Sequence, residues 1–272
     1  MEITPAIFSS VAVIALVCEY IDASIGMGYG TTLTPLLLII GFLPLQVVPS
    51  VLLGQLTGGL VGAYFHHRTG NVNFDFSQDH AIKERLRGLG YLPSSIDSKV
   101  VFVLAGCGMI GALIAVLFTI NIPMIALKTY IGLMVLIIGI IIIVRRNRKT
   151  NLSWKGLVTI GLIASFNKGA SGGGYGPLVT GGQIISGRGA RSSVGSTTLA
   201  EALVCIAAFV GYLIMKGDIY WTLAAATSIG SVIAAPFAAM TVKRIDTKNL
   251  KLAIGIVTCI LGLATLGKTF IF

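Results

Sequence analysis

The chain has 272 residues, of which 55% are hydrophobic and 11% are charged, and its mean hydropathy is +0.91. A soluble domain cannot hide that much apolar surface, so the composition excludes a soluble globular protein and predicts one that lies in a lipid bilayer. The formal net charge of +10 would suit a nucleic-acid partner, but the basic residues fall in the loops between apolar stretches, and we expect no nucleic acid to bind.

Ten apolar stretches follow one another along the chain. Several exceed the roughly 20 residues with which a helix crosses a bilayer. Three short ones, at 31–42, 156–167 and 175–187, are flanked by glycine and indicate broken or re-entrant helices. We therefore predict an all-α polytopic membrane protein with eight to ten transmembrane segments. The stretches are residues 6–22, 31–42, 45–65, 100–119, 122–144, 156–167, 175–187, 192–214, 219–242 and 249–267.

The distribution of Lys and Arg predicts the orientation of the chain. If the N-terminus is outside, the loops that face the cytoplasm carry 16 of the 20 basic residues, as the positive-inside rule requires. Both termini are then outside, because a re-entrant hairpin and a pair of full crossings return the chain to the same side. The hydrophilic insertion at about 75–98 is expected in the cytoplasm, with a short helix near Asp79 to Arg87. The cytoplasmic loops are residues 66–99, 145–155, 187–191 and 243–251.

An internal repeat divides the chain into residues 1–145 and 146–272. Matching residues are separated by 146 positions before the insertion and by 123 after it. The orientation deduced from the loops starts the first half outside and the second half inside, so the halves are predicted to be inverted repeats. Inverted repeats are typical of alternating-access transporters. The matches include Gly26, Gly28, Tyr29 and Gly30 with Gly172, Gly174, Tyr175 and Gly176, Gln55 with Glu201, and Lys128 with Lys251.

Two glycine clusters, at 26–30 and 172–176, predict where a solute binds. An interior glycine costs a helix about 1 kcal/mol relative to alanine, so each cluster should break its helix. A break that opens a new helix N-terminus inside the membrane presents N–H groups and a positive dipole end, which favour an anion. Ordinary packing of the two tyrosine rings remains an alternative to ligand contact. The candidate binding residues are Ser24, Gly26, Gly28, Tyr29, Gly30, Asn167, Lys168, Ser171, Gly172, Gly173, Gly174 and Tyr175.

Charged residues inside the apolar stretches are the second signal: Glu19, Asp22, Lys168 and Glu201. Each costs on the order of 2.5–3.5 kcal/mol at mid-membrane and needs a partner or a role. Asp22 and Lys168 are mates in the repeat and either pair structurally or act separately, with Lys168 attracting an anion and Asp22 taking a proton. Glu201 is either a proton-coupling site or a hydrogen-bonded structural residue. The coupling candidates are Asp22, Gln55 and Glu201.

The sequence does not favour an enzyme. It contains no HExxH motif, no suitably spaced carboxylate pair and no Ser/His/Asp set at membrane depth. The four cysteines lie in apolar stretches without CxxC spacing, so neither a metal nor another cofactor is expected. Arg188 and Arg191 either guide anions toward the inner mouth or serve as topology signals. The expected partners are a small anionic solute and the lipid bilayer, and a transporter or channel for a different small solute is the alternative.

Three segments closely resemble the sulfite exporter TauE/SafE family of membrane proteins: DASIGMGYGTTLTPLL at 22–37, NKGASGGGYGPLVTGGQ at 167–183 and VGSTTLAEALVC at 194–205. The resemblance covers nearly the whole chain outside the insertion. It implies a multi-pass transporter of the inner (plasma) membrane that exports sulfite, sulfoacetate or a related organosulfur anion. The second glycine cluster is richer in glycine than the first, so the resemblance and the residues together suggest an asymmetric site in which the second half dominates.

Overall fold

The computed structural model describes residues 3–26, 28–78, 91–145 and 153–242, together with parts of 252–270. The helix expected near Asp79 to Arg87 lies outside these residues. The elements are α1 (Pro5–Ile25), α2 (Tyr29–Ile40), α3 (Pro44–Arg68), β1 (Phe76–Gln78), β2 (Tyr91–Pro93), α5 (Ile96–Thr119), α6 (Met124–Arg145), α7 (Trp154–Ser171), α8 (Tyr175–Ile185), α9 (Ala190–Lys216) and α10 (Trp221–Thr241).

Helices form a bundle, and five of the described ones are long and apolar enough to cross a membrane: α1, α3, α5, α9 and α10. Large apolar side chains cover their outer faces, among them Phe102, Phe237 and Ile214. The exposed fraction of Ile214 is 76%. Such a surface is unsuited to water and typical of contact with lipid. The prediction of a helical membrane protein is confirmed. A small departure is the antiparallel pair β1–β2 in the hydrophilic insertion, where Ser77 faces Leu92.

The ends of the helices repeat at the offset found in the sequence. Glycines in the left-handed region interrupt the chain at the same place in each half, with φ of 81° at Gly26 and 74° at Gly172. Residues other than glycine rarely adopt this conformation, so the helix ends where the glycine stands. An offset of 146 relates three pairs of helix ends, namely Ile25 and Ser171, Tyr29 and Tyr175, and Pro44 and Ala190. Helices α5 and α10 correspond at an offset of 123 to within two residues at each end.

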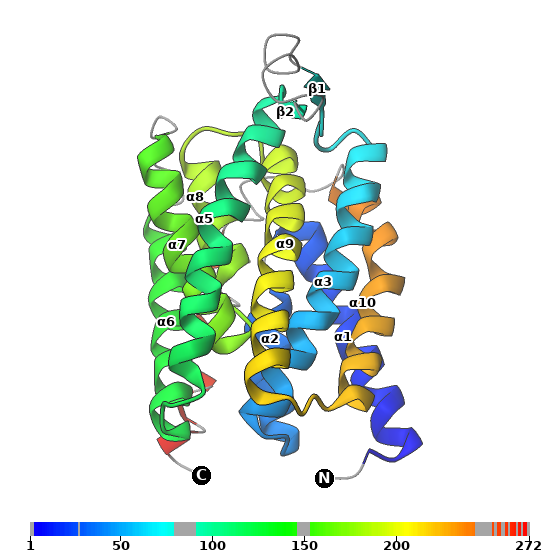
Figure 1. The fold of residues 1–272 in the computed structure, drawn as a ribbon, viewed down its shortest axis with the longest axis vertical. Helices are drawn as coiled ribbons and strands as arrows, with labels where there is room; N and C mark the ends of the chain where they lie inside the picture. The colour runs from blue at the N-terminus through cyan, green and yellow to red at the C-terminus, as the bar shows by residue number, and fades with distance from the viewer. Residues whose placement is uncertain are drawn as a thin grey trace.

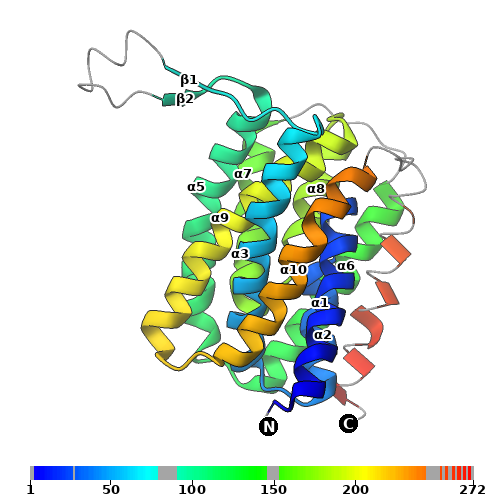
Figure 2. The same cartoon turned by 90° about the vertical axis from the view of Figure 1, so that its right-hand side faces the viewer.

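Packing follows the same correspondence. Helix α10 packs against α1 and α3, and its counterpart α5 packs against α7 and α9, while α3 and α9 meet at the centre. Figure 1 and Figure 2 show that α1, α3 and α10 begin at one end of the bundle, whereas α7, α9 and α5 begin at the other end, next to the β1–β2 hairpin. Corresponding helices thus run in opposite directions. Two buried apolar clusters lie in the bundle, one among α1, α2, α3 and α10 and the other among α3, α5, α7, α8 and α9.

Candidate functional site

The two helix breaks meet inside the bundle. A Cβ atom added to Gly30, at the start of α2, would overlap the carbonyl oxygen of Gly172. A Cβ atom added to Gly173 would lie 2.7 Å from the carbonyl carbon of Gly30 and 2.8 Å from the backbone nitrogen of Thr31. Backbone rather than side chain fills this contact, so only glycine allows so close an approach. The structure therefore brings the two predicted glycine clusters together.

The breaks also exchange contacts with the opposite half. Thr180 of α8 donates a hydrogen bond of 2.8 Å from Oγ1 to the carbonyl oxygen of Gly26. Its repeat mate, Thr34 of α2, lies against Gly172, where an added Cβ would be 3.0 Å from the Thr34 Oγ1 atom. A threonine of each short helix therefore lies against the break of the other half.

A chain of buried polar side chains runs beside the breaks, and it is made of two matched pairs. Gln55 of α3 donates from Nε2 to the Oδ2 atom of Asp22 on α1 at 3.0 Å. In the other half, Lys168 of α7 forms an ion pair with Glu201 of α9, with 2.7 Å between Nζ and Oε1. The pairs are linked because Lys168 Nζ also donates to Gln55 Oε1 at 3.5 Å. The sequence offered direct pairing of Asp22 with Lys168, but the structure connects them through Gln55.

Glu19 adds a third carboxyl group to this cluster. Its side chain is fully buried on α1, and neither carboxyl oxygen has a hydrogen-bond partner among the described residues. It lies within electrostatic range of Asp22, Glu201 and Lys168. Three carboxyl groups then share one ammonium group, and a buried site does not tolerate that excess of negative charge. The cluster thus contains more carboxyl groups than ammonium groups among its described members.

The two short helices differ in what lies at their N-termini. The backbone N–H of Tyr29, at the start of α2, donates to Asp22 Oδ1 at 3.1 Å, so this helix end already has an internal carboxylate. In the second half the mate of Asp22 is Lys168, a cation on α7. Ser171 instead accepts a hydrogen bond of 3.1 Å from the backbone N–H of Gly173. Among the described residues, the start of α2 therefore has its own carboxylate, whereas the buried carboxylate of the second half, Glu201, is paired with Lys168.

Other candidates lie at the edge of the cluster. Asn167 is buried on α7, but its Oδ1 atom accepts a hydrogen bond from Tyr130 of α6, so it faces the α6 side of the bundle. Ser24 is buried on α1, and its hydroxyl has no partner within the part of the chain that the structure describes. Gly28 and Gly174 stand immediately before α2 and α8 with positive φ. Gly28 and Gly174 therefore belong to the helix breaks rather than to the group of charged side chains.

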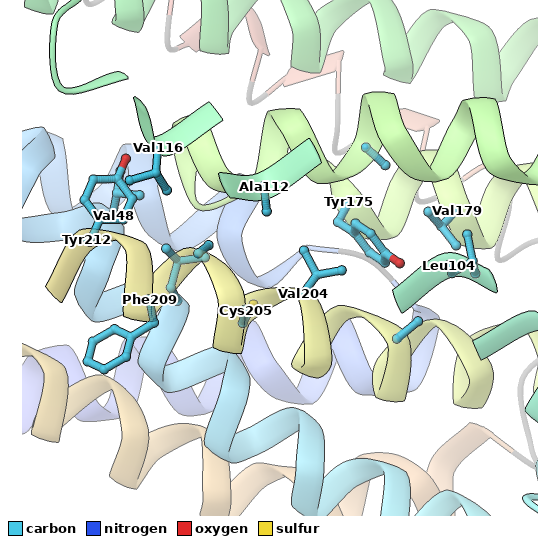
Figure 3. Packing of buried hydrophobic residues seen from close by; sticks show 14 of the residues in the cluster. Val48, Leu104, Ala112, Val116, Tyr175, Val179, Val204, Cys205, Phe209 and Tyr212 are labelled. Atoms are coloured by element: carbon cyan, nitrogen blue, oxygen red, sulfur yellow. The ribbon is translucent and has the colours of Figure 1, made fainter. Parts of the chain in front are cut away.

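The two tyrosines are fully buried and belong to different apolar clusters. Tyr29 packs beside Gly54, and its hydroxyl donates to the carbonyl oxygen of Thr227 at 3.4 Å. Tyr175 lies among Leu104, Val179 and Val204, as Figure 3 shows. Its hydroxyl has no partner among the described residues. The surroundings of Tyr175 are those of a packing residue.

Replacing Tyr175 separates packing from ligand contact. We expect Tyr175→Phe to keep transport and stability near wild type, because the ring supplies the contacts. Tyr175→Ala should lower the free energy of unfolding by about 3–5 kcal/mol through the cavity that it leaves. Chemical unfolding in detergent, with anion flux measured in parallel, checks both variants. Loss of flux in a stable Tyr175→Phe protein would show that the hydroxyl contacts the solute.

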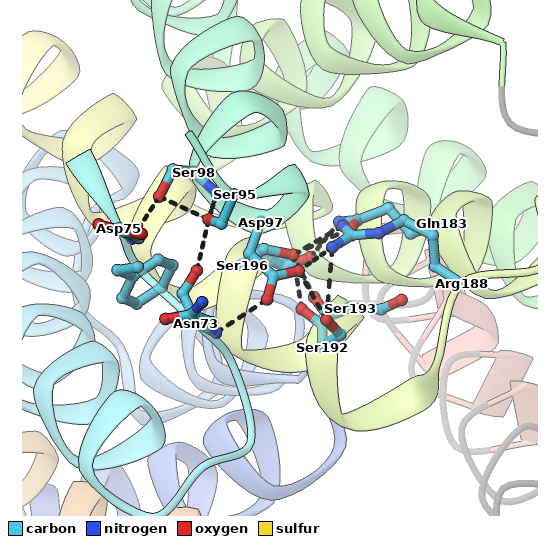
Figure 4. A network of polar contacts seen from close by, with 12 residues as sticks. Asn73, Asp75, Ser95, Asp97, Ser98, Gln183, Arg188, Ser192, Ser193 and Ser196 are labelled. Carbon is cyan, nitrogen blue, oxygen red and sulfur yellow. Dashed lines mark hydrogen bonds and ion pairs between the residues drawn. The ribbon is translucent and has the colours of Figure 1, made fainter. Parts of the chain in front are cut away.

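A second polar network lies toward the end of the bundle that carries the β1–β2 hairpin, and Figure 4 shows its contacts. Arg188, in the turn before α9, forms an ion pair with Asp97 of α5 and also donates to Gln183 of α8 and to Ser196 of α9. The Asp97 carboxylate is further held by Ser192, at 2.6 Å between Oγ and Oδ1. Burial lowers the pKa of Arg188 from its ordinary value, and the Asp97 carboxylate opposes that shift. The guanidinium remains charged, because arginine pKa values are far above neutral.

Sequence reasoning gave no site role to Glu19, Asp97 or Gln183. Glu19 stands three residues before Asp22, one helical turn away, and its repeat mate is Ser165. A carboxylate in an apolar stretch whose mate is uncharged was a signal that could have placed it in the cluster. Asp97 and Gln183 carried no such signal, because their partners lie far away in the sequence.

Comparison with known proteins identifies relatives of this chain. The family model described as Sulfite exporter TauE/SafE matches residues 11–77 and 87–265. A protein of Bacillus subtilis (strain 168) named probable membrane transporter protein YtnM is 29% identical over 257 residues, which cover 90% of this chain and 77% of that protein. No solved structure matches the chain.

Proposed function

The chain belongs to the sulfite exporter TauE/SafE family, and from this premise we propose that it is a secondary transporter that exports a small sulfur oxyanion or sulfonate by alternating access. That it is a membrane transporter follows from the family. The ion pair between Lys168 and Glu201, buried beside the two helix breaks, carries the proposal for the solute. The family description names sulfite. Sulfoacetate and related organosulfur anions carry a similar compact group of sulfur and oxygen atoms with negative charge.

In the proposed architecture the two halves are inverted repeats, and α2 and α8 are the short arms of re-entrant or broken helices. The matching helix ends and the opposite directions of corresponding helices support this arrangement. The buried contact between Gly30 and Gly173 would lie near the middle of the membrane. A site between two inverted halves can open to either side when one half rocks against the other.

The proposed binding step is an exchange of partners at Lys168. An anion that reaches the N-terminal end of α8 would take the place of the Glu201 carboxylate beside the ammonium group. Glu201, left without its cation in a buried place, would then bind a proton. Each transport cycle would then carry one anion and one proton across the membrane together. Asp22 and Gln55 would hold Lys168 in position, and the backbone N–H groups of Gly174 and of Gly173, which now donates to Ser171, would turn to the anion.

The proposed orientation places the end with the β1–β2 hairpin in the cytoplasm of a cell with this inner (plasma) membrane, and both termini outside. Helices α3, α6, α8 and α10 all finish at that end, as Figure 1 shows. The segments that follow them are the loops that carry most of the basic residues. The positive-inside rule supports this assignment.

Flux measurements in proteoliposomes test the proposal. Vesicles that contain the purified protein should release sulfite, sulfoacetate or thiosulfate with saturation, and an imposed pH gradient should change the rate. A rate that rises linearly with concentration and ignores the pH gradient would favour a channel, the alternative function. Absence of flux for every anion tested would contradict the proposed substrate class.

A further inference from the structure

Three pairs of repeat mates occupy the two ends of the bundle with opposite chemistry. Gln183 of α8 corresponds to Leu37 of α2, and Arg188 before α9 corresponds to Phe42 before α3, both at the offset of 146. Asp97 of α5 corresponds to Tyr220 before α10 at the offset of 123. Each set comprises a short-helix residue, a turn residue and a residue at the start of a long helix. One set is polar and the other is apolar or aromatic.

In both sets the turn residue contacts the residue at the start of the long helix. At the end where α10 begins, the ring of Phe42 packs against that of Tyr220, with centroids 6.2 Å apart and planes tilted by 53°. Phe42 and Leu37 are buried in the same apolar cluster, and Tyr220 packs against it. At the opposite end Arg188 pairs with Asp97 and donates to Gln183. The turn after each short helix is thus fastened to the long helix of the other half.

We propose that these two contacts are the gates of the transport pathway, with Phe42–Tyr220 closing the outer mouth and Arg188–Asp97 closing the cytoplasmic one. The inference rests on the proposed transport function. Both contacts are formed at once in this structure. Alternating access requires that one of them opens while the other holds.

The gates differ in what opens them. The outer gate holds by packing of aromatic and apolar side chains and resists an ion through the cost of desolvation. The cytoplasmic gate holds by an ion pair whose side chains keep 9% and 12% of their exposure. An anion that arrives from the cytoplasm competes with the Asp97 carboxylate for Arg188. Cytoplasmic anions therefore loosen their own gate, which suits outward transport.

A native thiol near the middle of α9 lies between the two contacts. Cys205 is fully buried on α9, one turn after Glu201, and lies within electrostatic range of Lys168 and Glu201. With Cys18, Cys107 and Cys259 replaced by alanine, Cys205 can be labelled with a membrane-impermeant methanethiosulfonate reagent added from either side. The labelling rate measures how often the site opens to that side and requires no knowledge of the substrate.

Asp97→Asn should raise the labelling rate from the cytoplasmic side by about tenfold and lower it from the outer side. A gate contact of about 1.4 kcal/mol accounts for a tenfold change. Phe42→Ala should have the opposite effect. Joint replacement by Asp97→Arg and Arg188→Asp should restore the low cytoplasmic rate. Lys155→Gln removes an exposed charge at the same end of the bundle and serves as the matched control, with a rate equal to that of the parent.

The outcomes separate the gates from the transported solute. If Asp97→Asn labels like Lys155→Gln from both sides, or if Cys205 is equally unreactive in every variant, the gate assignment is wrong. If labelling follows the prediction while no sulfur anion is transported, the gates stand and the proposed substrate class fails. If sulfur anions are transported but the labelling rate is the same in every variant, the proposed substrate class stands and the gate assignment fails.

Discussion

Replacing Lys168 with methionine should abolish anion transport. The ammonium group is buried on α7, where it contacts Glu201 and Gln55, and methionine fills a similar volume without charge or donors. Loss of a buried charge partner costs about 2–5 kcal/mol of binding, and 3 kcal/mol corresponds to a drop of more than a hundredfold in affinity. The initial rate of sulfite or sulfoacetate flux in proteoliposomes measures the effect. Lys155→Met, at an exposed position, is the control and should keep the wild-type rate.

Variants of Glu201 distinguish binding from folding in that result. Lys168→Met alone leaves the Glu201 carboxyl group without its partner, so it should also lower the free energy of unfolding. Adding Glu201→Gln should recover much of that stability without recovering transport. Glu201→Gln alone should keep anion flux but remove its dependence on a pH gradient. Unchanged flux in Lys168→Met would contradict the site, and a pH-dependent Glu201→Gln would contradict proton coupling at Glu201.

The helix breaks were predictable from the sequence because their cause is local. Gly26 and Gly172 end their helices through a backbone conformation that other residues avoid, and this property needs no distant neighbour. The offset of 146 between the glycine clusters then indicated which helix ends correspond. The short helices α2 and α8 therefore lie where the glycine clusters predicted them.

The partners of the charged residues were harder to predict. Spacing along a helix tells which side chains share a face, but it does not tell which helix lies opposite. Lys168 was matched with Asp22 by the repeat, whereas the packing of α7 beside α9 gives it Glu201. Arg188 and Asp97 are 91 positions apart, and no local pattern joins them. The sequence thus indicated four residues of the buried cluster, and the tertiary packing determined their pairs and added Glu19.

Contact between the two breaks depends on glycine, and alanine at Gly173 should disrupt it. The added Cβ would lie 2.7 Å from the carbonyl carbon of Gly30, and backbone atoms on both sides cannot move away as a flexible side chain would. Overpacking of this kind costs about 1–3 kcal/mol or more. We expect a lower free energy of unfolding in detergent and a loss of flux, because both halves must meet here for the site to form. Gly30→Ala should behave in the same way, since its Cβ would overlap the Gly172 carbonyl.

Gly106 provides the matched control for these glycine variants. It lies in α5 with open space around an added Cβ, so Gly106→Ala should keep both flux and stability. Helix propensity even favours alanine there by about 1 kcal/mol. If Gly173→Ala unfolds like Gly106→Ala and transports like wild type, the two breaks do not need their close contact. If Gly173→Ala is stable but inactive, the contact serves the movement of the halves rather than the fold. The resting structure would then accommodate the added Cβ, whereas the movement of one half against the other would not.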